Sequence, residues 1–359
     1  MRKPIHEFDK FTDLKDMLKV SGEKYGDRPA YMLKTDKKGE FKTITHKEFR
    51  DQINELGTKL IEMGLKGKRI AVIGENRYEW GVAYLAIVTG TGVVVPLDKA
   101  LPENEIESLI IRSKVDGVIF DKKYLDVFNN IKNNNTSNLT TYICMDYSED
   151  KDNILSYPKL INNGAKLLAN GDKKYGNITI DNTAMSIMIF TSGTTSISKA
   201  VMLSQKNICS DIYSLSCMAK VTSNDKFLSF LPLHHTFEST CTFLYGTSAG
   251  ITVVFTDGLK YIVKNLKEYE ITGFVCVPLV LETIYKKLNK EIEKQGKTKL
   301  IKFARKFSNF LLKFNIDKRK KIFKPILDQL GGKLNILIAG GAPMDKEAIS
   351  AFVDFGINL

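Results

Sequence analysis

The 359-residue sequence lacks several features that would assign it to whole classes of protein. No apolar run approaches the ~18 residues that a membrane-spanning helix needs. The N-terminus, MRKPIHEFDKF, has no apolar segment of the kind that a secretory signal peptide requires. The five cysteines form no Cys-x-x-Cys pair and are odd in number, which argues against a metal site or a disulfide framework. We therefore expect a cytoplasmic protein with reduced, buried thiols and no metal site.

Two familiar nucleotide-binding patterns are incomplete. Gly90-Thr91-Gly92 begins like a dinucleotide-binding fingerprint, but Val95 stands where the third glycine belongs. Gly296-Lys297-Thr298 resembles the end of a Walker phosphate loop, but Glu291 occupies the first glycine position. Neither pattern predicts a function here.

The positive charge lies in one part of the chain. Residues 286–324 contain 15 Lys and Arg against three acidic residues, a net charge of +12, and the remaining sequence is neutral overall. A nucleic-acid-binding protein usually spreads its charge over a larger face, so we expect no nucleic-acid partner.

The same segment, 286–324, shows a helical pattern. The apolar residues that fall on one helical face, with lysines around them, are Leu300, Ile301, Ala304, Phe307, Phe310, Leu311 and Phe314. A basic amphipathic helix can lie on an anionic membrane surface, which would place the protein peripherally on the inner membrane face. We favour the alternative, in which the helix packs its Phe face on the domain and its basic side is exposed to solvent.

Strand and helix patterns alternate along most of the chain. This alternation predicts an α/β fold of two successive doubly wound, mostly parallel sheets with helices on both faces. We place a first subdomain at 1–180 and a second at 181–359, the latter with a basic helical insertion at 286–324. Residues 129–138 and 162–177 are polar and are predicted to be surface loops.

The sequence IFTSGTTSISKA, residues 189–200, follows an apolar predicted strand. A loop that leaves a strand can turn its N–H groups toward a phosphate chain, and Gly193 allows close approach. The hydroxyls of Thr191, Ser192, Thr194 and Thr195 add donors, and Lys199 adds a point charge. A solvated Ser/Thr turn is the alternative interpretation of such a loop.

The loop resembles the signature of the adenylate-forming enzymes, Thr-Ser-Gly-Thr-Thr-Gly-x-Pro-Lys-Gly. The first five residues and the lysine match, whereas Ser196, Ser198 and Ala200 replace the second Gly, the Pro and the last Gly. Further stretches resemble the family in the same order along the chain: 25–30, 76–80, 95–97, 231–238, 277–285, 331–333 and 340–343. The run Leu-Pro-Leu-His-His-Thr-Phe-Glu at 231–238 is similar to that of the long-chain fatty acid–CoA ligases.

The resemblance implies a function and its site residues. The complete enzyme would activate a fatty acid with ATP and Mg²⁺ through acyl-AMP, and transfer the acyl group to coenzyme A. Lys199 and His235 would be catalytic, whereas His234 would be structural. The resemblance places the nucleotide at Thr191, Ser192, Gly193, Thr194, Thr195, Lys199, Gly340, Gly341, Ala342 and Pro343.

The resemblance also implies that the family's C-terminal domain is missing from this sequence, so we expect the 359-residue chain to be inactive alone. Two other functions stay open. One is an adenylation domain that loads a carrier protein. The other is a non-catalytic nucleotide- or acyl-binding module.

Overall fold

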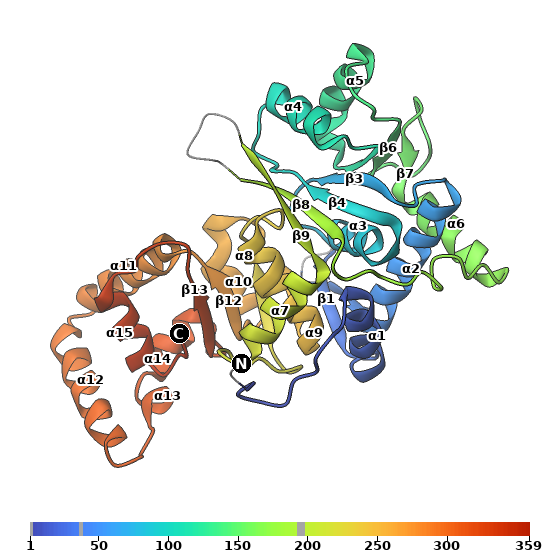
Figure 1. The fold of residues 1–359 in the computed structure, drawn as a ribbon. Coiled ribbons are helices and arrows are strands. Elements are labelled where there is room, and N and C mark those ends of the chain that lie inside the picture. Colours follow the sequence, from blue (N-terminus) through green and yellow to red (C-terminus); the bar gives the residue numbers. More distant parts are fainter. Residues whose placement is uncertain (1–2, 36–38, 192–197) are drawn as a thin grey trace. The chain divides into compact units, whose positions relative to one another are not determined.

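The computed structural model describes residues 3–35, 39–191 and 198–359. Contacts divide the chain into two compact units, the first formed by Met1–Ser223 with Pro232–Gly250 and the second by Asn224–Leu231 with Ile251–Leu359 (Figure 1). This division differs from the predicted boundary at residue 180, because the strands after that residue hydrogen-bond to the first sheet.

The first unit contains a seven-stranded sheet of order β7-β6-β5-β3-β4-β8-β9 among the described residues. All neighbours are parallel except β8 and β9, which are antiparallel. The strands are β3 (Lys68–Ile73), β4 (Gly92–Pro96), β5 (Gly117–Phe120), β6 (Thr141–Cys144), β7 (Leu155–Ser156), β8 (Met185–Thr191) and β9 (Lys199–Ser204). The chain moves outward from β3 in both directions, which creates a topological switch point between β3 and β4.

Helices cover both faces of this sheet (Figure 1). On one face, α4 (Glu103–Ser113) and α5 (Leu125–Asn134) pack against alternate residues of β3 and β5, such as Ala71, Ile73 and Phe120. The other face carries α2 (His46–Glu62), α3 (Tyr78–Ala86) and α6 (Tyr157–Ala169). Because both faces are covered, the central strands are apolar throughout, as in other parallel sheets.

Local sequence explains several element boundaries. Thr45 and Glu48 form the capping box that begins α2. The predicted loops at 129–138 and 162–177 are wrong in their first parts, since α5 extends to Asn134 and α6 to Ala169. The Ser156 hydroxyl caps α6, and Gly164 lets the helix approach α2 so closely that a Cβ would lie 1.8 Å from the Glu55 carbonyl oxygen.

The glycines of the incomplete fingerprint serve packing. A Cβ on Gly90 would lie 2.6 Å from the buried Tyr175 ring, and one on Gly92 would lie 2.0 Å from the Lys68 carbonyl oxygen. The first unit also contains the antiparallel pair β1 and β2 and a group of helices. These are β1 (Pro29–Lys34), β2 (Phe41–Thr45), α1 (Leu14–Lys24), α7 (Gln205–Ser216), α8 (Thr236–Glu238) and α9 (Tyr245–Ala249).

The second unit is built on four parallel strands in the order β13-β12-β10-β11. They are β10 (Lys226–Ser229), β11 (Thr252–Phe255), β12 (Gly273–Cys276) and β13 (Ile336–Ala339). The helices are α10 (Ile262–Glu268), α11 (Pro278–Lys294), α12 (Thr298–Leu312), α13 (Arg319–Ile322), α14 (Lys324–Leu327) and α15 (Lys346–Asp354). The predicted α/β class with two mostly parallel sheets is confirmed.

The basic segment departs from the prediction that we favoured. Ser308 is the one buried residue of α12, and the side chains of Phe303, Phe307 and Phe310 are exposed. The expectation that the Phe face packs on the domain is therefore wrong for the described residues. Within that part of the chain, no helix is both long and apolar enough to cross a membrane.

Candidate functional site

The hydroxyl-rich loop joins two paired strands. β8 ends at Thr191 and β9 begins at Lys199, and these two residues lie opposite each other in the antiparallel register. Both residues are exposed. Ser192, Gly193, Thr194 and Thr195 lie outside the described residues, so the structure fixes the two ends of the predicted phosphate loop.

Arg112 contacts the loop where it returns to β9. From the last turn of α4, its Nη2 donates to the Ser198 carbonyl oxygen at 2.5 Å and its Nη1 to the Ser198 Oγ at 3.1 Å. The guanidinium also lies over the Phe190 ring, 5.5 Å from the centroid. Sequence reasoning missed Arg112, because one arginine at a helix end carries no motif.

The predicted catalytic histidine begins a short helix. The Phe237 backbone N–H donates to the His235 Nδ1 at 3.3 Å, which places the ring proton on Nε2. The side chain of His235 is exposed. An exposed Nε2–H can donate a hydrogen bond to a ligand oxygen.

The neighbouring His234 lies close to a carboxylate. Its Nε2 lies 3.5 Å from the Asp98 Oδ1. Burial lowers the pKa of His234, and the Asp98 carboxylate partly opposes this shift. The turn that carries both histidines is held by the Leu233 N–H, which donates to the Asn76 Oδ1 at 3.1 Å. The structural role that we predicted for His234 stays a prediction.

A cavity of about 310 Å³ brings part of the predicted site together. It lies at the carboxyl ends of β4 and β8, where parallel α/β sheets commonly bind ligands. Thr191, Ser198, His234 and His235 all line it, together with Asp98. Lys199 is outside this lining set.

The predicted glycine-rich nucleotide loop belongs to the second unit. Gly340 follows β13 and donates its N–H to the Cys276 carbonyl oxygen at 3.2 Å, at the carboxyl ends of β12 and β13. Gly341 has a φ of +87°, a conformation that side chains rarely adopt. Gly341, Ala342 and Pro343 are exposed. Each of the two predicted nucleotide loops therefore follows the carboxyl end of a strand, each within its own unit.

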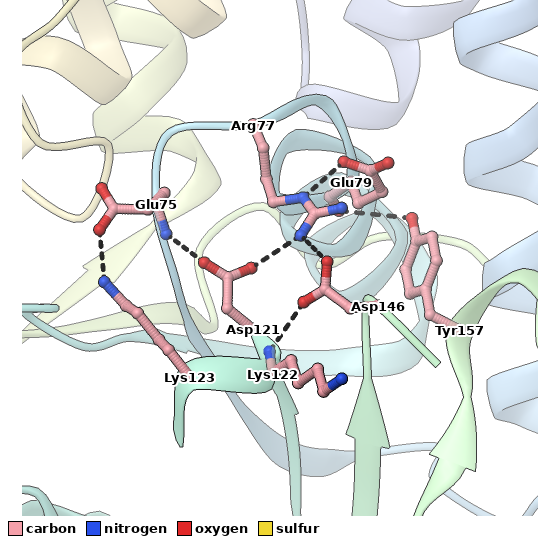
Figure 2. Close-up of polar contacts among 8 residues, drawn as sticks. All are labelled: Glu75, Arg77, Glu79, Asp121, Lys122, Lys123, Asp146 and Tyr157. Atoms are coloured by element: carbon pink, nitrogen blue, oxygen red, sulfur yellow. Dashed lines mark hydrogen bonds and ion pairs between the residues drawn. The ribbon is translucent and has the colours of Figure 1, made fainter. Parts of the chain in front are cut away.

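Near the carboxyl ends of β3, β5 and β6, an arginine binds three carboxylates (Figure 2). Arg77 Nη1 lies 3.1 Å from Asp121 Oδ1 and 2.6 Å from Asp146 Oδ1, and its Nε lies 2.7 Å from Glu79 Oε2. The Glu75 N–H donates to Asp121 Oδ2 at 2.6 Å. This cluster fixes the loop after β3, which includes Asn76.

Burial raises the pKa of Asp121, although Arg77 and the Glu75 N–H oppose the rise. The pKa of Asp146 is lowered, because the hydrogen bonds from Arg77 and the Lys122 N–H outweigh its burial. The described residues contain no group of three or more His, Cys, Asp or Glu side chains that could hold a metal ion. The carboxylates of the Arg77 cluster are therefore best understood as ligands of a cation that the chain itself supplies.

Within the first unit, the two ends of the hydroxyl-rich loop and both histidines therefore meet at one cavity at the carboxyl ends of β4 and β8. The chain belongs to the AMP-binding enzyme family, which matches residues 18–358.

Two curated proteins illustrate which relatives this chain is similar to. Long-chain-fatty-acid–CoA ligase 5 of Mus musculus is 29% identical over 340 residues, which cover 87% of this chain and 48% of that protein. Long-chain-fatty-acid–[acyl-carrier-protein] ligase AEE15 of Arabidopsis thaliana is 30% identical over 77% of this chain and 39% of its own length. The chain thus spans about half the length, or less, of these curated relatives.

Solved structures share the fold. A long-chain-fatty-acid-CoA ligase (FadD1) from Archaeoglobus fulgidus matches with a TM-score of 0.73 and 16% identity, over 99% of this chain and 62% of that chain. The N-terminal domain of FACL13 from Mycobacterium tuberculosis matches with a TM-score of 0.67 and 18% identity, over 97% and 74%. At these identities the likeness concerns the fold alone.

Proposed function

We propose that a protein containing this chain is an ATP-dependent long-chain fatty acid–CoA ligase. The observation that carries the proposal is the placement of the loop ends. Thr191 and Ser198 line the same cavity as His235, and Lys199 stands opposite Thr191 in the strand pair. Relatives that are named as long-chain fatty acid ligases support the choice of substrate.

In the first step, the fatty acid carboxylate attacks the α-phosphorus of ATP, and pyrophosphate leaves with the bond electrons. Catalysis of such a step is mostly positioning and charge stabilisation. The loop from Thr191 to Lys199 holds the β- and γ-phosphates, and Lys199 neutralises charge that grows on the leaving pyrophosphate. The loop at 340–343 lies beside the adenine.

Mg²⁺ is commonly bound through substrate phosphates with one or two carboxylates, rather than by a dedicated protein cage. The absence of an acidic ligand cluster among the described residues fits that mode of binding. Mg²⁺ would reduce the charge of the triphosphate when bound.

In the second step, the thiol of coenzyme A attacks the acyl carbonyl and AMP leaves. His235 is suited to the region where acyl group, adenylate and thiol meet, because its Nε2–H is free to donate to an oxygen there.

One specific observation supports a second candidate for the thiol that receives the acyl group. The relative that is 30% identical is named as an acyl-carrier-protein ligase. Both candidate functions share the adenylation step and differ only in the thiol that receives the acyl group.

Fatty-acid-dependent exchange of labelled pyrophosphate into ATP tests the shared step, on the 359-residue chain and on a longer protein that contains it. Product analysis with coenzyme A and with a phosphopantetheine-bearing carrier protein then separates the acceptors. In the longer protein, exchange with palmitate but not acetate, followed by palmitoyl-CoA formation, is the expected result, and the 359-residue chain alone should form no palmitoyl-CoA. Nucleotide binding without exchange in either protein would instead indicate a non-catalytic binding module.

A further inference from the structure

Helix α12 is docked on the second unit by its polar side. Arg305 Nε lies 2.6 Å from Asp354 Oδ2, and its Nη1 lies 2.7 Å from Glu347 Oε1. Asn309 Nδ2 donates to Asp354 Oδ1 at 2.9 Å. These contacts attach α12 to α15, and they orient the helix about its own axis.

The opposite side of α12 is an apolar stripe. Its members are spaced three and four residues apart, so they share one face of the helix. Between 47% and 67% of each of these side chains is exposed: Leu300, Phe303, Phe307, Phe310 and Phe314. A helix that turns an aromatic face outward has the reverse of the usual orientation on a protein surface.

The phenylalanines of the stripe are ordered by contact with one another. Phe303 and Phe307 stack with 6.3 Å between ring centroids and 6° between planes. Phe310 and Phe314 meet edge to face at 5.1 Å. The stripe thus contains two ring pairs, which follow a helix about 22 Å long and reach Phe314 just beyond its end. An exposed apolar surface of this kind marks an interaction site.

The lysines beside the apolar stripe indicate what kind of partner binds it. Lys299, Lys306 and Lys313 are spaced seven residues apart, which places them along one edge of the stripe. All three are exposed, and none forms an ion pair with a described residue. Segment 286–324 carries the whole net charge of the sequence, +12. A surface that combines phenylalanines with a row of free lysines matches an anionic bilayer, where acyl chains lie beneath charged headgroups.

We propose that α12 is a peripheral membrane anchor that inserts the Leu300–Phe314 stripe into the interface of an anionic bilayer. Lys299, Lys306 and Lys313 contact the headgroups. The contacts of Arg305 and Asn309 keep the helix fixed to the second unit, so the anchor holds that unit at the lipid surface. This inference goes beyond the proposed ligase activity and does not depend on it.

Vesicle co-sedimentation of the 359-residue chain tests the proposal. Vesicles of phosphatidylglycerol and phosphatidylcholine in equal amounts should bind it, and pure phosphatidylcholine should bind it at least tenfold more weakly. Raising NaCl from 0.1 to 0.5 M should weaken the binding, because the Debye length shortens below ~10 Å. Equal binding to both vesicle types, or no binding, overturns the proposal.

Two triple variants separate charge from insertion. Replacing Lys299, Lys306 and Lys313 with Gln should weaken anionic binding about 100-fold, since each lysine near such a surface contributes a factor of about five. The matched control replaces Lys66, Lys166 and Lys173 with Gln. These are exposed lysines of the first unit, so the control removes the same charge and should change binding by less than threefold.

The second variant replaces Phe303, Phe307 and Phe310 with Gln, a good helix former. It should lose vesicle binding while circular dichroism and melting temperature stay unchanged. Exchanging the exposed Met218 and Leu259 for Gln provides the control. If the Phe variant still binds anionic vesicles like the parent, the attraction is purely electrostatic and the anchor proposal is wrong.

A single probe reports insertion directly. In Phe310→Trp, emission should shift to the blue on anionic vesicles and be quenched by brominated acyl chains. The native Trp80 is buried and should be insensitive to both. If sedimentation velocity shows instead that the Phe triple variant dissociates a dimer, with no effect on vesicles, the stripe is an interface between copies and not an anchor.

Discussion

Arg77 offers the sharpest test of how this fold supports its site, since it binds three carboxylates at once. The Asp121 side chain is 8% exposed and that of Arg77 is 27% exposed. Removing one partner of a buried ion pair costs about 3–5 kcal/mol, because the other charge stays buried and unpaired. Since Arg77 is about a quarter exposed, we expect Arg77→Met to lower the free energy of unfolding by about 3 kcal/mol.

The assay uses a reporter that the sequence provides. Trp80, the single tryptophan, lies three residues after Arg77 and is 1% exposed. Urea unfolding followed by its fluorescence therefore reports on the first unit. Lys123→Met is the matched control in the same loop region, since the Lys123–Glu75 ion pair is solvent-exposed and exposed pairs contribute about 0–1 kcal/mol.

The pH dependence of the variant gives an independent check. Burial already raises the pKa of Asp121, and loss of Arg77 should raise it further. An acid whose pKa is higher in the folded state binds more protons there, so protonation stabilises the fold. The deficit of Arg77→Met should consequently shrink as the pH falls from 7 to 5. In the double variant, Asp121→Asn should restore at least about 1 kcal/mol at pH 7, since it removes the buried charge. A deficit below 1 kcal/mol that does not vary with pH would refute this reasoning.

Three further predictions concern the cavity and its loop. In the longer protein, Lys199→Ala should reduce pyrophosphate exchange about 10- to 100-fold, equivalent to the 1.5–3 kcal/mol of a charged hydrogen bond, with an unchanged melting temperature. An unaffected rate would remove Lys199 from the phosphate site. In the longer protein, Arg112→Lys should lower kcat/KM for ATP about fivefold, since an ammonium cannot replace the two-nitrogen contact with Ser198. A kcat/KM equal to the parent's would contradict this. Burial lowers the pKa of His234, so the unfolded state binds the proton first and the free energy of unfolding should fall as the pH drops through about 6.5. His234→Gln should flatten this fall in urea titrations at pH 7.0 and 6.0, whereas an identical slope would exclude the histidine as its source.

The sequence predicted the elements whose patterns are local. The apolar strand that was predicted before the hydroxyl-rich loop is β8, and the alternation of strand and helix patterns predicted the α/β class. Both loops that were predicted to hold phosphate or adenine follow strands, at Thr191 and at Ala339. Such features depend on short stretches that carry their own chemistry.

The features that the sequence did not predict depend on partners far along the chain. The part of α6 from residue 162 onward is predicted as a loop because its asparagines and glycine obscure the apolar stripe, yet Gly164 is what allows its contact with α2. Arg112 lies 86 residues before the serine that it binds, and Arg77 lies 69 residues before Asp146. A single sequence contains no signal for such pairs, because any arginine can pair with any carboxylate.

For α12 the sequence predicted the helix and its apolar face, but not the direction in which that face turns. The period of the phenylalanines predicts an apolar face, and it cannot tell whether that face turns toward the protein or away from it. Two specific contacts decide, since Arg305 and Asn309 both bind Asp354 and thereby turn the phenylalanines outward. Because Asp354 is 8% exposed and carries both contacts, its replacement should free the helix to rotate. In this chain the polar residues of α12 therefore determine where its apolar residues act.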